Sequence, residues 1–158
     1  MTDPSFTDVL IVGAGPVGLT LANILVRHGI TCRIIDQLPA YQKEIRAKGL
    51  TPRTEEIFED LGILDQIHAR GSRNRLFRFY ERDQLVRELD PATDPTNQPT
   101  PDAPYRGPFF ISQAQTEAVL RERLTQLEAR GATGIIFGTS GYDVERELRA
   151  YAEVARLR

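Results

Sequence analysis

Residues 8–19 read DVLIVGAGPVGL, an apolar run followed by three glycines in the spacing G-x-G-x-x-G. The run is short, rich in β-branched residues and ends at Gly13, so it predicts a strand buried on both faces of a parallel sheet. Pro16 sets the backbone for a first helical position, and the mostly apolar residues 17–28 predict a helix behind it. A strand, a glycine turn and a helix are therefore expected in immediate succession.

The chain then returns in a second buried strand. Gly29 can end the helix in a left-handed conformation, and residues 30–35 form another largely apolar run that closes at Asp36. A strand, a crossover helix and a second strand within about 30 residues form a β-α-β unit, which is nearly always right-handed and belongs to a parallel sheet. The sequence therefore predicts an α/β fold of Rossmann-like type.

The three glycines and the acid that ends the second run fit the binding of a dinucleotide. Gly13 permits the tight turn, Gly15 lets the backbone approach a pyrophosphate, and Gly18 lets the helix lie close to the strands. Pro16 opens the helix whose N–H groups and partial positive charge favour that anion. Asp36 can accept hydrogen bonds from a ribose diol and disfavours the 2′-phosphate of NADP. The residues alone leave FAD and NAD as alternatives, besides a glycine turn that binds nothing.

Further along, the chain alternates helical and extended patterns. Thr51 is expected to cap a helix that starts with Pro52, and Ser112 with Gln115 has the spacing of a capping box at the start of another. Residues 90–108 hold six of the ten prolines and predict a surface loop without regular structure. The other expected elements are a helix at 64–70, a small antiparallel hairpin or an extended excursion within 76–89, a strand at 133–137 and a helical tail at 142–158.

Composition and charge place the chain among ordinary globular proteins. Apolar residues make up 41% and the net charge is -2, which gives no charge-based attraction to nucleic acid or anionic membranes. No N-terminal signal and no apolar run of membrane-spanning length is readable, so a cytoplasmic location is expected. Cys32, the one cysteine, is expected to be a small buried residue on a strand. His28 and His68 lack ligand-like neighbours in the sequence, so no metal site is predicted.

Three stretches of the chain carry a family resemblance: residues 12–19, 46–57 and 111–117. Together they resemble the single-component flavoprotein hydroxylases, the group that contains phenol, p-hydroxybenzoate and polyketide-tailoring hydroxylases. The similarity covers roughly residues 7–138. It implies FAD as cofactor, NAD(P)H as the co-substrate that reduces the flavin, and O2 as the source of an oxygen delivered to an aromatic small molecule. Because the cofactor carries this chemistry, no catalytic side chain is assigned in the chain.

The resemblance also adds two residues to the expected site. Arg46 matches an arginine that contacts the cofactor near its diphosphate, and Gln113 matches a glutamine that reaches the ribityl and diphosphate region. Each has a simpler alternative: Arg46 as a solvated loop cation, and Gln113 as a residue that only starts a helix. The predicted cofactor site consists of Gly13, Gly15, Pro16, Gly18, Asp36, Arg46 and Gln113.

The sequence departs from the family pattern beyond these stretches. Family members carry later Asp-Gly and Gly-Asp motifs and a substrate domain, and neither dipeptide occurs here. We therefore expect an incomplete FAD-binding domain at residues 1–138, a divergent helical tail of a truncated product at 139–158, and no substrate domain. Strand 9–12 would then expose an unpaired edge that favours self-association. Two alternative functions stay open: an NAD-dependent oxidoreductase, and a non-catalytic nucleotide-binding fragment.

Overall fold

A computed structural model describes residues 7–36, 49–73, 75–129 and, for the backbone, 135–138. The chain divides into two compact units. The first unit joins residues 1–43 to residues 120–158, and the second consists of residues 44–119. Each unit is described by itself below. Arg46 and the predicted tail at 139–158 lie outside the described residues.

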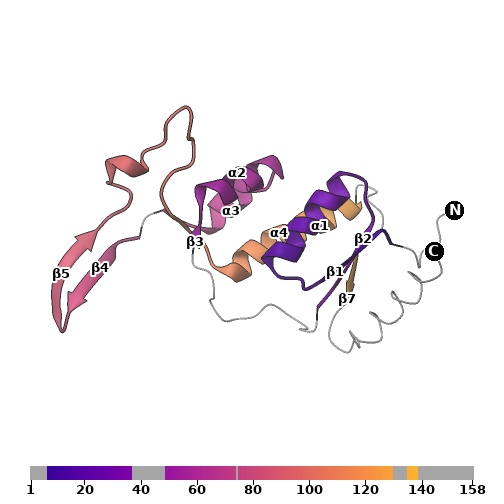
Figure 1. Cartoon of the computed structure of the whole chain (residues 1–158), viewed down its shortest axis with the longest axis horizontal. Helices are drawn as coiled ribbons and strands as arrows, with labels where there is room; N and C mark the ends of the chain where they lie inside the picture. The colour runs from indigo at the N-terminus through magenta and orange to yellow at the C-terminus, as the bar shows by residue number, and fades with distance from the viewer. Residues whose placement is uncertain (1–6, 37–48, 74, 130–134, 139–158) are drawn as a thin grey trace. The chain divides into compact units, whose positions relative to one another are not determined.

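The first unit contains a parallel sheet and the helix that connects its first two strands. β1 (Val9–Val12) leads through α1 (Pro16–Arg27) to β2 (Cys32–Ile35), and β2 also pairs with β7 (Ile135–Gly138) (Figure 1). The order is β1-β2-β7, and both pairings are parallel. The predicted parallel sheet is thereby confirmed, with strand bounds within about two residues of the expected ones.

The two strands that flank α1 differ in burial, which corrects one expectation. β2 is largely buried, whereas in β1 only Ile11 is buried and Val12 is 57% exposed. The prediction that β1 is buried on both faces was therefore wrong. In the described part of the chain β1 pairs on one side only, with β2. An apolar sequence allows a strand to be buried, but the elements that pack beside the strand determine how much of it is buried.

α4 (Gln113–Ala129) contributes its later part to the first unit and packs there against α1. The side-chain amide of Asn23, which is 1% exposed, donates one hydrogen bond to the carbonyl of Leu19 and a second to the carbonyl of Leu120. Leu120 and Leu124, four positions apart and so on one face of α4, are fully buried. α4 thus contacts α1 through buried leucine side chains and through the hydrogen bonds of a buried amide.

The second unit holds two short helices beside a small antiparallel pair of strands. α2 (Pro52–Asp60) and α3 (Leu64–Arg70) follow β3 (Gly49–Leu50), which pairs with β6 (Phe109–Phe110). Thr51 caps α2 as expected, since its hydroxyl accepts a hydrogen bond from the N–H of Thr54 at 3.4 Å. The bounds of α3 are those that the sequence predicted.

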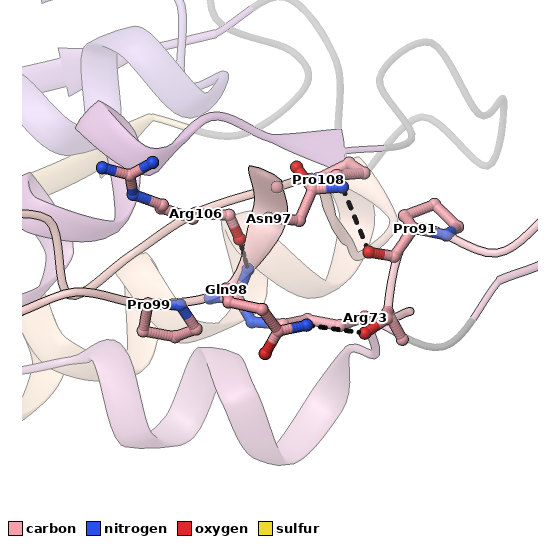
Figure 2. A pocket seen from close by; sticks show the side chains of 9 residues that line it. Arg73, Pro91, Asn97, Gln98, Pro99, Arg106 and Pro108 are labelled. Carbon is pink, nitrogen blue, oxygen red and sulfur yellow. Dashed lines mark hydrogen bonds between the residues drawn. The ribbon is translucent and has the colours of Figure 1, made fainter. Parts of the chain in front are cut away.

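A hairpin and a proline-rich loop complete the second unit. β4 (Phe77–Glu81) and β5 (Gln84–Leu89) form an antiparallel hairpin, the first of the two alternatives expected for residues 76–89. The loop at 90–108 is more ordered than expected, because Pro95–Asn97 form a 3-10 turn and the loop's side-chain amides bond to its own carbonyls. Figure 2 shows two of these bonds beside a cavity of about 150 Å³ that three prolines help to line. None of the helices described is long and apolar enough to cross a membrane.

Candidate functional site

The turn between β1 and α1 requires two of its three glycines for reasons of backbone geometry. Gly13 has φ of +106°, a conformation that glycine adopts far more readily than other residues. Gly18 lies in the first turn of α1, and a Cβ atom at this position would collide with the carbonyl oxygen of Gly13. The helix can therefore lie this close to the turn only if residue 18 has no side chain.

Gly15 has no comparable requirement within the protein. Its φ of -77° and ψ of -175° are extended and accessible to any residue. A Cβ atom added to Gly15 would have no heavy atom within 4 Å. Neither the backbone nor the packing of the described residues therefore calls for glycine here. Because Gly15 has no side chain, an approaching group can reach its backbone.

The carboxylate of Asp36 lies beside the glycine turn, at the corner where β1, α1 and the end of β2 meet. Asp36 directly follows β2, and its Oδ2 accepts a hydrogen bond from the N–H of Ala14 at 2.6 Å. Parallel pairing of β1 with β2 brings the ends of both strands to one edge of the sheet, and this explains the contact across 22 residues of sequence. The sequence-based expectation required this proximity, and the structure provides it.

The N-terminus of α1 opens at this corner without a side-chain cap. Gly15 is the N-cap residue and Pro16 the first residue of the helix, and the first turn contains no acidic residue. Helix N-termini carry N–H groups that lack intrahelical partners, together with a partial positive charge. The corner therefore combines accessible backbone, helix N–H groups and a carboxylate on the neighbouring strand.

Five of the seven predicted site residues thus lie together: Gly13, Gly15, Pro16, Gly18 and Asp36. Arg46 lies outside the described residues. Gln113 belongs to the second unit and starts α4, where its side-chain amide donates to the carboxylate of Glu117 at 2.7 Å. The cofactor-binding roles of all seven residues stay predictions.

Sequence reasoning missed one residue at the corner. The guanidinium of Arg121, on α4, donates from Nη2 to the carbonyl oxygen of Ala14 at 3.1 Å. The two residues are 107 positions apart in the sequence. Arg121 directly follows the buried Leu120, and no local pattern distinguishes it from the other arginines of α4. Only the packing of α4 on α1 could have identified it.

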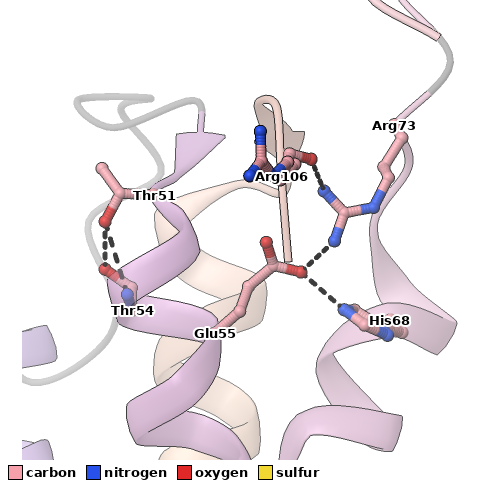
Figure 3. Close-up of polar contacts among 6 residues, drawn as sticks. All are labelled: Thr51, Thr54, Glu55, His68, Arg73 and Arg106. Carbon is pink, nitrogen blue, oxygen red and sulfur yellow. Dashed lines mark hydrogen bonds and ion pairs between the residues drawn. The ribbon is translucent and has the colours of Figure 1, made fainter. Parts of the chain in front are cut away.

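A second polar cluster, in the second unit, was also missed (Figure 3). The carboxylate of Glu55 is fully buried and bonds to His68 Nε2 at 2.8 Å and to Arg73 Nη2. Arg73 also donates to the carbonyl of Arg106 at 2.9 Å, and His68 packs against the ring of Phe109. His68, which has no ligand-like neighbour in the sequence, thus has a carboxylate beside it in the structure, and Arg73 is partly buried in the same cluster.

Cys32 behaves as the sequence predicted. It lies on β2 with no exposed surface, and burial raises the pKa of its thiol above the ordinary value. A raised pKa keeps the sulfur protonated, and the protonated form is the poor nucleophile. Cys32 is therefore a packing residue of the sheet.

Comparison with known proteins relates the chain to FAD-binding proteins. A family model described as FAD binding domain matches residues 6–153. That match continues past residue 138, where a domain boundary was expected, and the boundary itself stays a prediction. The solved flavin-dependent monooxygenase PieE, in complex with FAD and substrate, resembles 86% of this chain with a TM-score of 0.66 and 28% identity. An aklavinone-11 hydroxylase with FAD and aklavinone resembles 87% of it with a TM-score of 0.62 and 31% identity.

Curated relatives show the same similarity at the level of sequence. A flavin-dependent monooxygenase of Mycobacteroides abscessus is 42% identical over 120 residues, which cover 75% of this chain and 25% of the relative. A 3-(3-hydroxy-phenyl)propionate/3-hydroxycinnamic acid hydroxylase of Mycolicibacterium smegmatis is 37% identical over 159 residues, covering 90% of this chain and 27% of the relative. The chain therefore spans about a quarter of the length of these relatives.

Proposed function

The chain belongs to the FAD binding domain family, and from this premise we propose that the corner between β1, α1 and β2 holds the ADP half of FAD. The glycine turn and the β-α-β unit then form a Rossmann-like dinucleotide site. In this proposal the chain is the N-terminal portion of an NAD(P)H- and O2-using monooxygenase that hydroxylates an aromatic ring. FAD supplies the redox chemistry when bound, and the residues of the corner bind and orient it.

Each residue of the corner has a distinct part in the proposal. The bare backbone at Gly15 and the N-terminus of α1 at Pro16 receive the diphosphate. Gly13 and Gly18 give the turn its shape. Asp36 accepts hydrogen bonds from the ribose hydroxyls, because its carboxylate already lies against the turn. Arg46 and Gln113 are supporting contacts that the family resemblance alone suggests.

The observation that carries the proposal is the conformation of Gly15. Its φ and ψ suit any residue, and a Cβ atom added there meets no neighbour within 4 Å. A position with these properties gains no stability from glycine, since glycine loses more conformational entropy on folding than other residues do. A diphosphate that approaches the backbone at this residue would explain why position 15 has no side chain.

The activity and substrate class of the whole enzyme rest on its relatives. Their names include hydroxylases of a hydroxyphenyl propionate, of pentachlorophenol and of aklavinone. We accordingly propose an aromatic small molecule as substrate and NAD(P)H as co-substrate. These relatives favour a monooxygenase over an NAD-dependent oxidoreductase. A cytoplasmic location and self-association through the edge of β1 stay predictions.

Titration with FAD tests the proposed site. In calorimetry on the 158-residue chain, we expect Gly15→Val to weaken FAD binding about 100-fold, because a branched side chain would remove two or more backbone contacts to the diphosphate. Gly15→Ala serves as the matched intermediate and should lose less. The free energy of unfolding of both variants should stay close to that of the wild type, since the added atoms meet open space.

Two results would end the proposal. One is a wild-type chain that does not bind FAD. The other is a folded Gly15→Val variant with wild-type affinity, because it would mean that no ligand approaches the backbone at this residue.

A further inference from the structure

Arg121, on α4, reaches the glycine turn from a distant part of the sequence. Its Nη2 donates to the carbonyl oxygen of Ala14 at 3.1 Å. The guanidinium keeps its positive charge throughout the ordinary pH range. A permanent cation therefore contacts the turn that, under the proposed function, receives the diphosphate of FAD.

The buried contact between α1 and α4 explains why Arg121 reaches this place. Asn23 of α1 binds the carbonyl of Leu120 at 3.1 Å and that of Leu19 at 2.9 Å. Leu120 is fully buried, so the backbone immediately before Arg121 is fixed against α1. The guanidinium extends from a rigid helix and does not depend on a loop for its position.

The contact has a consequence for the direction of one amide. A trans peptide is planar, so the carbonyl of Ala14 and the N–H of Gly15 point to opposite sides of the same bond. A carbonyl held by Arg121 therefore directs the N–H of Gly15 away from α4. On the preceding peptide, Asp36 holds the N–H of Ala14 in the same way. Ala14 is thus fixed through both its N–H and its C=O.

We propose that Arg121 is a positioning residue for the diphosphate of FAD. It holds the carbonyl of Ala14 away from the anion, so that the N–H of Gly15 is available to donate, and its charge compensates the partial negative charge of that carbonyl. This inference rests on the proposed function, since it assigns the orientation of the same turn. It places part of the cofactor machinery on α4, far along the sequence from the glycine motif.

The test compares two arginines of one helix in the full chain. Arg121→Ala removes the contact, and Arg123→Ala removes the same charge from a residue two positions away, for which the structure gives no bond to the turn. ADP and FAD are the probes in calorimetry. The position of the Gly15 amide resonance, recorded without ligand, reports the orientation of the turn independently of activity.

We expect Arg121→Ala to weaken ADP and FAD binding about tenfold, the range for loss of one charge-assisted hydrogen bond. The Gly15 amide resonance should move in this variant. Arg123→Ala should bind within about twofold of the wild type, as expected for a screened charge that makes no contact. Arg121→Lys keeps the charge but not the planar fork, so its affinity should fall between wild type and Arg121→Ala.

The outcomes separate this inference from the proposed function. A wild-type chain that binds neither ADP nor FAD overturns both. A wild-type chain that binds, with equal affinities for Arg121→Ala and Arg123→Ala, overturns only the role of Arg121. Circular dichroism establishes that the variants are folded. If Arg121→Ala is unfolded, Arg121→Lys decides: wild-type affinity together with an unmoved Gly15 resonance would contradict the proposal.

Discussion

α1 and α2 begin in almost the same way, yet their N-termini are completed differently. Both start with a proline after an extended residue: Gly15 has φ of -77° and ψ of -175°, and Thr51 has φ of -87° and ψ of 158°. Thr51 caps its helix with its own hydroxyl, whereas Gly15 has no side chain to do so. The backbone conformation is therefore shared, and the difference lies in whether the chain provides the cap.

The first turns of the two helices differ in charge as well. α2 carries Glu55 in its first turn, so a buried acid of the chain interacts with the positive end of the helix. α1 has no acid in its first turn. α2 thus begins with a side-chain cap and an acid in its first turn, while α1 begins with neither. A helix N-terminus becomes a candidate anion site when the chain leaves it incomplete.

The largest expected effect comes from removing the acid of α2. Glu55→Gln leaves the guanidinium of Arg73 without its carboxylate partner. Loss of one partner of a fully buried pair costs roughly 3–5 kcal/mol, but the Arg73 side chain is 33% exposed, so we expect about 2 kcal/mol. The free energy of unfolding in urea measures the loss.

The adjacent residue provides the control for this variant. Glu56 is exposed and pairs with Arg53 on the surface, so Glu56→Gln should cost at most about 0.5 kcal/mol. Equal losses for the two variants would show that the buried cluster contributes no more to stability than a surface pair, and the contrast between the two helices would lose its electrostatic part.

A smaller effect is expected from the cap of α2. Thr51→Ala removes the hydroxyl that accepts from the N–H of Thr54 and should lower the free energy of unfolding by about 1 kcal/mol. Thr51→Ser keeps the hydroxyl and should stay near the wild type. Urea unfolding of the three chains checks this, and a Thr51→Ala variant as stable as Thr51→Ser would mean that the hydroxyl does not act as a cap.

The sequence predicted these helix starts because their signals are local. The glycine spacing, Pro16, Pro52 and the cap at Thr51 all act within a few residues, and local geometry determines them. The second strand and Asp36 followed from one β-α-β unit, whose topology has few alternatives.

The long-range contacts could not be predicted in the same way. Arg73 meets Glu55 across 18 positions and Arg121 meets Ala14 across 107, and neither spacing has a periodic signature. Burial of an acid at residue 55 also contradicts what its charge favours in a single sequence, since Glu is rarely buried without a partner. The exposure of Val12 on β1 likewise depends on which segments pack beside the strand. These features belong to packing, and a single sequence does not encode them locally.

The smallest expected change in stability would make the start of α1 resemble that of α2. Gly15→Ser supplies a hydroxyl at the N-cap position, and because glycine is itself a tolerable N-cap the gain should be only about 0.3 kcal/mol. The same hydroxyl would occupy an N–H group that the proposed diphosphate needs, so FAD affinity should fall while thermal stability rises slightly. Calorimetric titration and thermal unfolding of one sample measure both quantities. A variant that gains stability and keeps full FAD affinity would mean that the missing cap of α1 serves no ligand, because cap and cofactor would then not compete for the same N–H groups.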